Sequence, residues 1–168
     1  MAEKKMLAPN TTIWWIDKTD VVGAFPAAGE LNSDGVNISC AIVEGYTLGS
    51  TDPQTDTTRT ICDEGNVQNP TNSQYEATLT AFRDADLNDN TSVFNKFYNL
   101  FAQPDAEGFL VRRIGKKSSE AAASSDDVEA FGVSSDFPQS VDGGENAPPI
   151  QMTVPFLPTG EYSGIYTL

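Results

Sequence analysis

Alternation between apolar and polar residues at every second position is the feature that most restricts how this chain can fold. The pattern is clearest over residues 36–43, 74–83 and 150–156. Period-two alternation is typical of a β-strand with one buried face and one face that meets water or a partner. Residues 11–16 (TTIWWI) are rich in β-branched and aromatic side chains, which also favours a strand. Weaker strand patterns occupy residues 59–63, 109–114, 130–135 and 162–168.

One segment instead shows helical periodicity. Its apolar residues fall within an arc of roughly 120° on a helix, and they are Val93, Phe94, Phe97, Leu100 and Phe101. Residues 90–92 offer N-cap side chains, and Pro104 ends the helix. A turn is predicted at residues 158–160, between the last two strands. The chain is therefore expected to be mostly β, a β-sandwich or barrel with one flanking α-helix.

The length of 168 residues favours one domain, spanning 1–168, with a core of its own. We expect three less regular segments in it: an N-terminal arm at 1–10, a loop at 49–58 and a loop at 116–127. The loop at 49–58 reads GSTDPQTDTT and has nothing to bury. Within the later loop, residues 118–127 are Ser, Ala and acidic residues, which predicts an exposed or partly ordered segment.

Composition argues against several classes of function. With 24 Asp and Glu against 10 Lys and Arg, the net charge is −14, which disfavours general attraction to nucleic acid or anionic lipid. The chain has no histidine, so a Ser-His-Asp triad, a Cys-His pair and a His-ligated metal are excluded. Glycine motifs for phosphates or dinucleotides are missing as well. We therefore expect no enzyme activity and no cofactor.

Two cysteines, Cys40 and Cys62, allow at most one disulfide, and both are expected to be reduced. Cys40 lies in an alternating run and is predicted to be buried. No apolar run approaches the ~20 residues of a membrane span, and the N-terminus has no signal-peptide pattern. These features predict a soluble protein, made in the cytosol, that has no membrane partner.

The acidic residues 84–90 partly match a calcium-binding loop. Asp84, Asp86 and Asn88 correspond to its first three ligand positions. The sixth position, which requires Gly, is Asp89, and the twelfth, which requires Glu, is Asn95. Ordinary turn and helix-cap chemistry explains the segment better, so no metal is expected.

Two groups of residues are candidates for contacts between subunits. Arg112, Arg113, Lys116 and Lys117 form a basic cluster, which is either a solvated strand end or a contact with acidic surface on another copy of the chain. Trp14 and Trp15 are adjacent and so point to opposite faces of a strand. One can enter the core while the other meets a second layer or a partner subunit, and packing of both in the core is the alternative.

The order of these segments resembles the tail tube (major tail) proteins of long non-contractile-tailed phages. The resemblance rests on the run 36–43, then EGYTLGSTDPQTDTTRTICDEGN (44–66), then YEATLTAFRD (75–84), followed by the Asp-rich turn, the single helix and the strand at 109–114. It extends from about residue 11 to 168. No invariant catalytic motif is part of it.

The resemblance implies six-subunit rings, stacked into a hollow tube in the virion tail, through which DNA passes without specific binding. It also implies homo-oligomers that work with tape measure, tail terminator and distal tail proteins. In that family an early hairpin or loop reaches a neighbouring ring. Residues 49–58 match it by position, so Asp52, Pro53 and Asp56 are the implied assembly contacts.

Other functions stay open at this point. A β-sandwich module that binds a carbohydrate or a receptor would act as a monomer on a virion tip or a cell surface. An inner tube of a contractile system, or a head-decoration protein, would share the logic of assembly. The acidic composition fits a tube lumen, because each Lys or Arg facing DNA would add attraction and slow its passage.

Overall fold

The computed structural model describes residues 10–52, 54–56, 69–72, 74–141 and 150–168. These described residues contain two α-helices, α1 (Ala28–Ser33) and α2 (Val93–Phe101), and two short 3-10 helices, η1 (Lys18–Asp20) and η2 (Ser39–Ala41). The described strands are β1 (Thr11–Asp17), β2 (Val36–Asn37), β3 (Thr47–Ser50), β4 (Gln54–Asp56), β5 (Asn69–Asn72), β6 (Tyr75–Phe82), β7 (Glu107–Ile114), β8 (Asp127–Ser135), β9 (Gln139–Val141) and β10 (Gln151–Thr167).

Eight strands form one antiparallel sheet in the order β2–β1–β7–β8–β10–β6–β3, with β9 paired to the start of β10. Within the described residues, β4 and β5 pair with each other and form a separate two-stranded ribbon. The sheet is not closed into a barrel. The prediction of a mostly β fold is confirmed, and the short helix α1 is an addition to the predicted helix.

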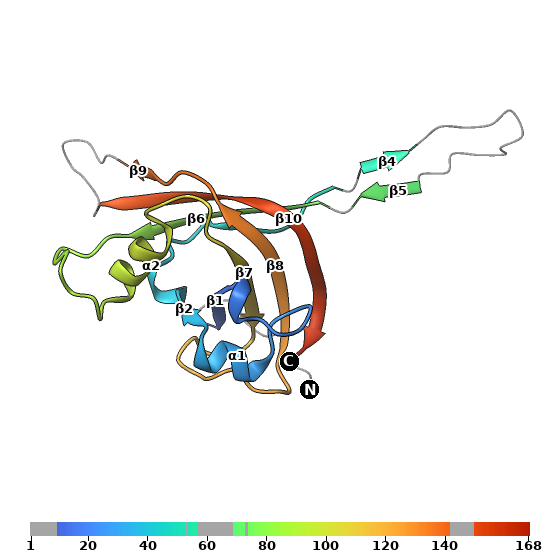
Figure 1. Ribbon diagram of the computed structural model, residues 1–168, viewed down its shortest axis with the longest axis horizontal. Helices are drawn as coiled ribbons and strands as arrows, with labels where there is room; N and C mark the ends of the chain where they lie inside the picture. The colour runs from blue at the N-terminus through green and yellow to red at the C-terminus, as the bar shows by residue number, and fades with distance from the viewer. Residues whose placement is uncertain (1–9, 53, 57–68, 73, 142–149) are drawn as a thin grey trace, which may run out of the picture.

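Strand β10 joins the two parts of the sheet. Its start pairs with β6 over 151–156, and the rest pairs with β8 over 156–167. The strand bends between these parts (Figure 1), where its register to β8 shifts and Gly160 has φ of 90°. The turn predicted at residues 158–160 was wrong, because these residues form a bulge that bends the strand without ending it.

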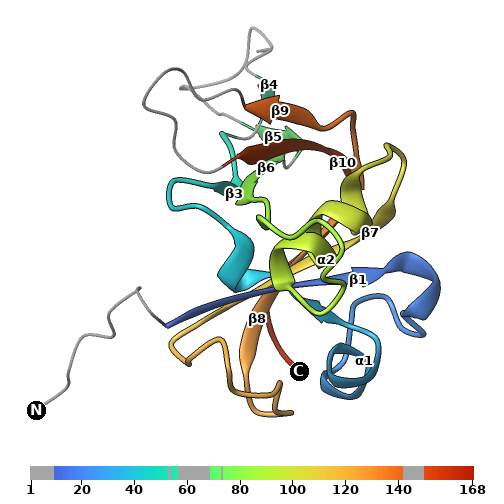
Figure 2. The same ribbon diagram turned by 90° about the vertical axis from the view of Figure 1, so that its left-hand side faces the viewer.

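The larger hydrophobic core lies inside this bend. Helix α2 packs there, as Figure 2 shows between the two parts of the sheet. Phe97 and Phe101 of the helix are fully buried, and the Phe101 ring makes edge contacts with Trp15 and Phe156 at centroid distances of 4.9 and 5.1 Å. The structure confirms the predicted helix at residues 93–101 and its apolar face.

A second core covers the opposite face of β1, β7 and β8. It contains Trp14, Leu31 of α1, Phe109 and Ala122. The end of β10 closes it, since the Tyr166 hydroxyl donates a hydrogen bond to the carbonyl oxygen of Pro26 at 2.7 Å. Burial, with Glu30 nearby, raises the pKa of Tyr166 to about 12. These three strands are therefore covered on both faces.

The strand predicted at residues 36–43 was wrong beyond its first two residues. After β2 the chain turns into η2, because polar side chains replace the strand ladder. The Ser39 hydroxyl accepts a hydrogen bond from the Ile13 backbone N–H at 2.8 Å, and Asn37 Oδ1 accepts one from the Ser39 N–H at 3.1 Å. Cys40 therefore lies in η2 and is exposed, contrary to prediction. The strand predicted at 59–63 lies outside the described residues.

Candidate assembly surfaces

One face of the sheet has no covering layer among the described residues. We call it the uncovered face; its residues are Thr47 and Gly49 of β3, Glu76, Thr78, Thr80 and Phe82 of β6, Gln151, Thr153 and Pro155 of β10, and Gln139 and Val141 of β9. They alternate with buried residues along β6 and β10, and the strand register places those of β3 and β9 on the same side. In Figure 1, β6 and the first part of β10 run along the side of the molecule away from α1.

The uncovered face is polar but carries little charge. Glu76 is the one charged residue among the described positions that define it. Neighbouring threonines bond to each other, and the hydroxyl oxygens of Thr80 and Thr153 are 2.8 Å apart across β6 and β10. Small hydroxyl side chains on paired strands suit a pleated surface that stays in contact with water.

Both tryptophans are buried by the chain itself. Trp14 is 4% exposed in the second core, and Trp15 is 3% exposed in the larger core. The expectation that they point to opposite faces of one strand is confirmed. Because side chains of the same chain cover both rings, little of either ring is left for a neighbouring subunit.

Arg113, which we considered for a subunit contact, is 1% exposed and organises the segment between β7 and β8. Its guanidinium donates hydrogen bonds to the backbone oxygens of Ala121, Lys117 and Glu120 at 2.9–3.0 Å. It also donates to Asp126 Oδ2 at 2.8 Å and lies 4.7 Å from the centre of the Trp14 ring. A buried charge requires this degree of pairing. The segment is thus held against the second core through the buried residues Ala122 and Asp126, while most of residues 118–127 are exposed.

Asp126 is the buried partner of two cations, Arg113 and Lys116. Burial by itself would raise the pKa of this carboxyl. Hydrogen bonds from Lys116, Arg113 and the Ala123 backbone N–H outweigh burial and lower the pKa to about 2. The carboxylate is therefore charged at neutral pH, and it closes the segment onto the sheet.

The other two members of the basic cluster differ in their surroundings. Arg112 is half-buried, donates to Glu129 Oε2 at 2.9 Å and bonds the carbonyl oxygen of Leu48 at 2.6 Å. Lys117 has an exposed side chain. Three cations of the cluster thus bind groups of the same chain, and Lys117 is the member best placed to contact another molecule.

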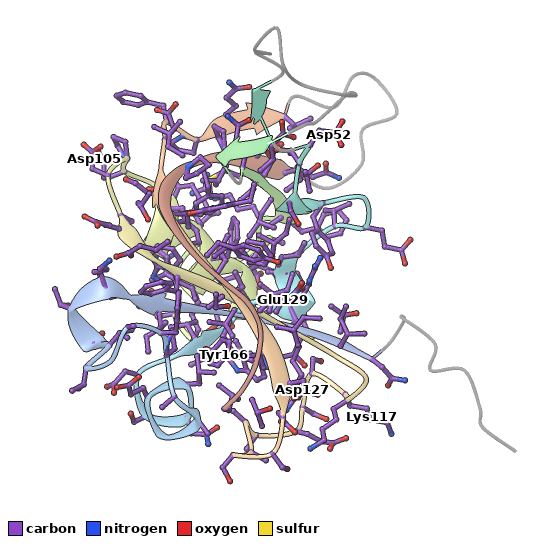
Figure 3. The ribbon with its side chains drawn as sticks, turned by 90° about the vertical axis from the view of Figure 1, so that its right-hand side faces the viewer. Asp52, Asp105, Lys117, Asp127, Glu129 and Tyr166 are labelled. Atoms are coloured by element: carbon purple, nitrogen blue, oxygen red, sulfur yellow. The ribbon has the colours of Figure 1, made fainter. Side chains whose placement is uncertain are left out.

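The ribbon of β4 and β5 projects from the body of the molecule (Figure 1). It follows Asp52, which is exposed and is labelled beside it in Figure 3. The segment expected to be a loop at 49–58 thus includes the end of β3 and all of β4. Asp56 is the last residue of β4, and Pro53 lies outside the described residues.

The Asp-rich segment 84–90 forms turns, as preferred from the sequence, whereas the N-cap residue of α2, Ser92, makes no side-chain capping hydrogen bond. Backbone N–H groups of Asp86 and Asn88 donate to the carboxylates of Asp84 and Asp86 at 2.9 and 3.0 Å. Asn95, 3% exposed, donates to the Asp86 and Asp89 carbonyl oxygens. In the part of the chain that the structure describes, no three His, Cys, Asp or Glu residues are grouped to hold a metal ion. Nor does that part contain a helix long and apolar enough to span a bilayer.

Sequence reasoning missed an open, largely apolar pocket of about 400 Å³. Ile13, Ile42, Val43 and Tyr46 line it together with Cys40. It lies beside β3, at the seam where the sheet does not close, and Ser118 and Glu44 are also among its lining residues. Because the lining comes from separate segments, no local pattern signals the pocket.

Sequence reasoning also missed an exposed aromatic residue between β8 and β9. Phe137 directly precedes Pro138 in the link between the two strands, and its side chain is 71% exposed. Acidic residues adjoin the chain just before it: Asp136 directly precedes it, the Asp105 N–H donates to the Ser135 oxygen at 2.8 Å, and Glu107 pairs with Ser134. In the sequence, the local signal is a Phe placed between Asp136 and Pro138.

Comparisons with known proteins agree with this architecture. A family model described as phage tail tube protein matches residues 1–168. Among solved structures, the chain is similar to one in the "Cryo-EM structure of the anti-feeding prophage (AFP) baseplate, 6-fold symmetrised", with a TM-score of 0.55 and 11% identity over 99% of this chain and 97% of that chain. At that identity the likeness shows the fold alone. Comparison with curated proteins returned no match.

Proposed function

The chain belongs to the phage tail tube protein family, whose model matches its whole length, and from this premise we propose that its copies assemble into stacked rings forming a tube that conducts DNA. Family membership makes it a structural protein of the virion tail. A tube built from one small subunit needs surfaces that a single copy leaves unsatisfied. The uncovered face, the projecting ribbon and the pocket are such surfaces.

The observation that carries the proposal is the uncovered face. A sheet face that the described part of its chain leaves bare is completed either by another protein layer or by a water-filled space. This face has no Lys or Arg among its described positions and few apolar side chains. Double-stranded DNA carries about one negative charge per 1.7 Å, and each facing cation would add attraction. A neutral to acidic polar wall suits the inside of a conduit, so we assign this face to the lumen.

The ring size that we propose is six. The baseplate whose chain shares this fold is described as six-fold symmetrised. The proposed partners in the tail are the tape measure, tail terminator and distal tail proteins. We expect no catalytic step, because the role consists of assembly and passage.

The projecting ribbon is proposed as the contact between rings, and Asp52, Pro53 and Asp56 are the residues proposed to take part in that contact. The Thr51 backbone N–H donates to the Gln74 oxygen at 2.9 Å, so the chain leaves and re-enters the sheet at adjacent points. Replacement of residues 52–73 by an Asn-Gly turn should therefore leave β3 and β6 in place. The shortened chain should fold with an unchanged far-UV spectrum yet form no stacked tubes. Normal tubes from this variant would remove the ribbon from the interface.

Electron microscopy of the concentrated wild-type protein, combined with light scattering, tests the proposal as a whole. The expected result is hollow tubes of stacked rings, with monomers at low concentration. A strictly monomeric protein at every concentration would contradict it, and binding on a glycan array would then favour a ligand-binding module. Isolated single rings without stacking would favour a second candidate, a ring component of a baseplate, which the fold likeness supports.

A further inference from the structure

We propose that Phe137 of one copy inserts into the apolar pocket beside Cys40 of the next copy in the ring. The inference rests on the proposed function, because it requires that copies of this chain associate side by side. It identifies the two surfaces that meet. Phe137 with Asp105, Glu107 and Asp136 is called the knob, and the pocket keeps its name.

The knob and the pocket lie at opposite edges of the half-covered part of the sheet. Tyr46, which lines the pocket, directly precedes β3, while Phe137 lies just before β9. In the strand order β3–β6–β10–β9, these are the two outer strands. A contact between unlike surfaces on opposite edges repeats from copy to copy, and it closes into a ring when the rotation allows.

The knob and the pocket also adjoin opposite ends of the same row of paired residues across the sheet. Thr47 pairs with Thr78, Thr78 pairs with Pro155, and the Pro155 oxygen accepts a hydrogen bond from the Asp136 N–H at 2.9 Å. Tyr46 and Phe137 therefore adjoin the two ends of one row. When two copies are placed edge to edge with their sheets continuous, the knob of one lies opposite the pocket of the other.

Size and stiffness suit the contact. A pocket of about 400 Å³ is large enough for an aromatic side chain. Its apolar lining would remove from water a ring that is 71% exposed in the single copy. Pro138 restricts the backbone of Phe137 to extended conformations, so little further ordering is needed on binding. Buried aromatic anchors of this kind commonly dominate interface energetics.

One cation near the pocket is opposite in charge to the knob. The knob carries Asp105, Glu107 and Asp136, whereas the exposed Lys117 directly precedes Ser118, which lines the pocket. Figure 3 shows Asp105 and Lys117 on opposite sides of the molecule, as a repeating contact requires. Glu44 also lines the pocket, so Lys117 is the side chain that supplies the attraction. Complementary charge of this kind selects the partner surface and the register.

Disulfide trapping tests the geometry. In a Cys62→Ser background, Phe137→Cys is combined with the native Cys40, at concentrations where the wild type forms tubes. Mild oxidation should give a ladder of linked species up to a closed ring, reversed by reductant and abolished by Cys40→Ser. Val22→Cys is the matched control, because Val22 is 94% exposed and outside the proposed contact, and it should give no ladder.

Assembly itself provides the second measurement. Phe137→Ser should raise the concentration for half-maximal assembly at least about tenfold, Phe137→Leu should raise it less, and thermal unfolding should be unchanged for both. Wild-type tubes together with no ladder, an internal disulfide in a monomer, or normal assembly of Phe137→Ser would overturn this inference and leave the proposed function standing. Absence of wild-type tubes would overturn both.

Discussion

The part of the sheet formed by β1, β7 and β8 is covered on both faces, whereas the part formed by β3, β6, β9 and the start of β10 is covered on one. In the first part, α1 and the segment between β7 and β8 supply the second layer. In the second part, most outward positions are Thr or Gln, with a single Glu; the others are Gly49, Phe82, Val141 and Pro155. The difference shows that the elements forming the second layer pack on one half of the sheet. The other half is free to suit what lies outside the subunit.

Removal of the buried Arg113 should have the largest effect on this comparison. Arg113→Ala leaves Asp126 without a main partner and releases the segment that it binds, at a cost of about 3–5 kcal/mol in unfolding free energy. Chemical denaturation measures the loss. The control is Arg112→Ala on the next residue, which is half-buried and should cost about 1 kcal/mol. Equal losses for the two variants would show that the second layer does not depend on Arg113.

Substitution of one glycine in each half by alanine compares how tightly the two halves are packed. A Cβ at Gly108 of β7 would lie 2.3 Å from the Ile16 carbonyl oxygen and 2.7 Å from the Trp15 ring, whereas one at Gly49 would meet nothing within 4 Å. Gly108→Ala should therefore cost about 3 kcal/mol, and Gly49→Ala should stay within about 0.5 kcal/mol of the wild type. Thermal and denaturant unfolding of the pair measure the difference. Similar stabilities would contradict the assignment of tight packing to the doubly covered half.

Acid should weaken the doubly covered half through Asp126. Because the pKa of this carboxyl is lowered from 3.8 to about 2 on folding, its contribution is complete above pH 4 and is lost as the pH falls from 4 to 2. The linked loss is about 2 kcal/mol. Denaturant unfolding between pH 7 and pH 2 measures it. The Asp126→Asn variant should be less stable than the wild type at pH 7, and its unfolding free energy should fall less between pH 4 and pH 2. An equal fall in the two proteins would show that Asp126 does not cause the acid sensitivity.

A lysine on the uncovered face should barely affect folding but should change function. Thr80→Lys places a cation on a solvated surface, so unfolding free energy should change by less than about 0.5 kcal/mol. Tubes of this variant should bind double-stranded DNA, and the binding should fall steeply with salt. Fluorescence anisotropy of short labelled duplexes measures this, with wild-type and Thr80→Gln tubes as controls. Tubes of Thr80→Lys that bind no more DNA than the controls would place this face outside the lumen.

The same contrast explains which strands were predictable. Strands β6 and the start of β10 are buried on one face, so their period-two pattern predicted them clearly. Residues 109–114 and 130–135 gave weaker patterns because β7 and β8 are buried on both faces, which erases alternation. The prediction failed at 36–43, where Asn37 and Ser39 bond to the backbone, and at 158–160, where Pro and Gly bend a strand instead of reversing it.

The candidate surfaces were less predictable than the fold. Adjacent Trp14 and Trp15 had to point to opposite faces, but what covers each ring comes from distant segments. The basic cluster was visible in the sequence, yet the partners of Arg113 include Thr12, 101 positions away in the chain. The pocket and the exposure of Phe137 also depend on separate segments meeting in space.

By itself, the sequence determined that this protein is mostly β, carries one amphipathic helix packed on a sheet, and lacks the side chains for His-based catalysis. Local periodicity and composition suffice for such conclusions, because strand and helix periods and the inventory of side chains are properties of neighbouring residues. Only the tertiary structure decided which half of the sheet stays uncovered, which cations are buried, and where the knob and pocket lie. Those features depend on contacts between residues far apart in the chain, and burial and pairing exist only after the chain has folded.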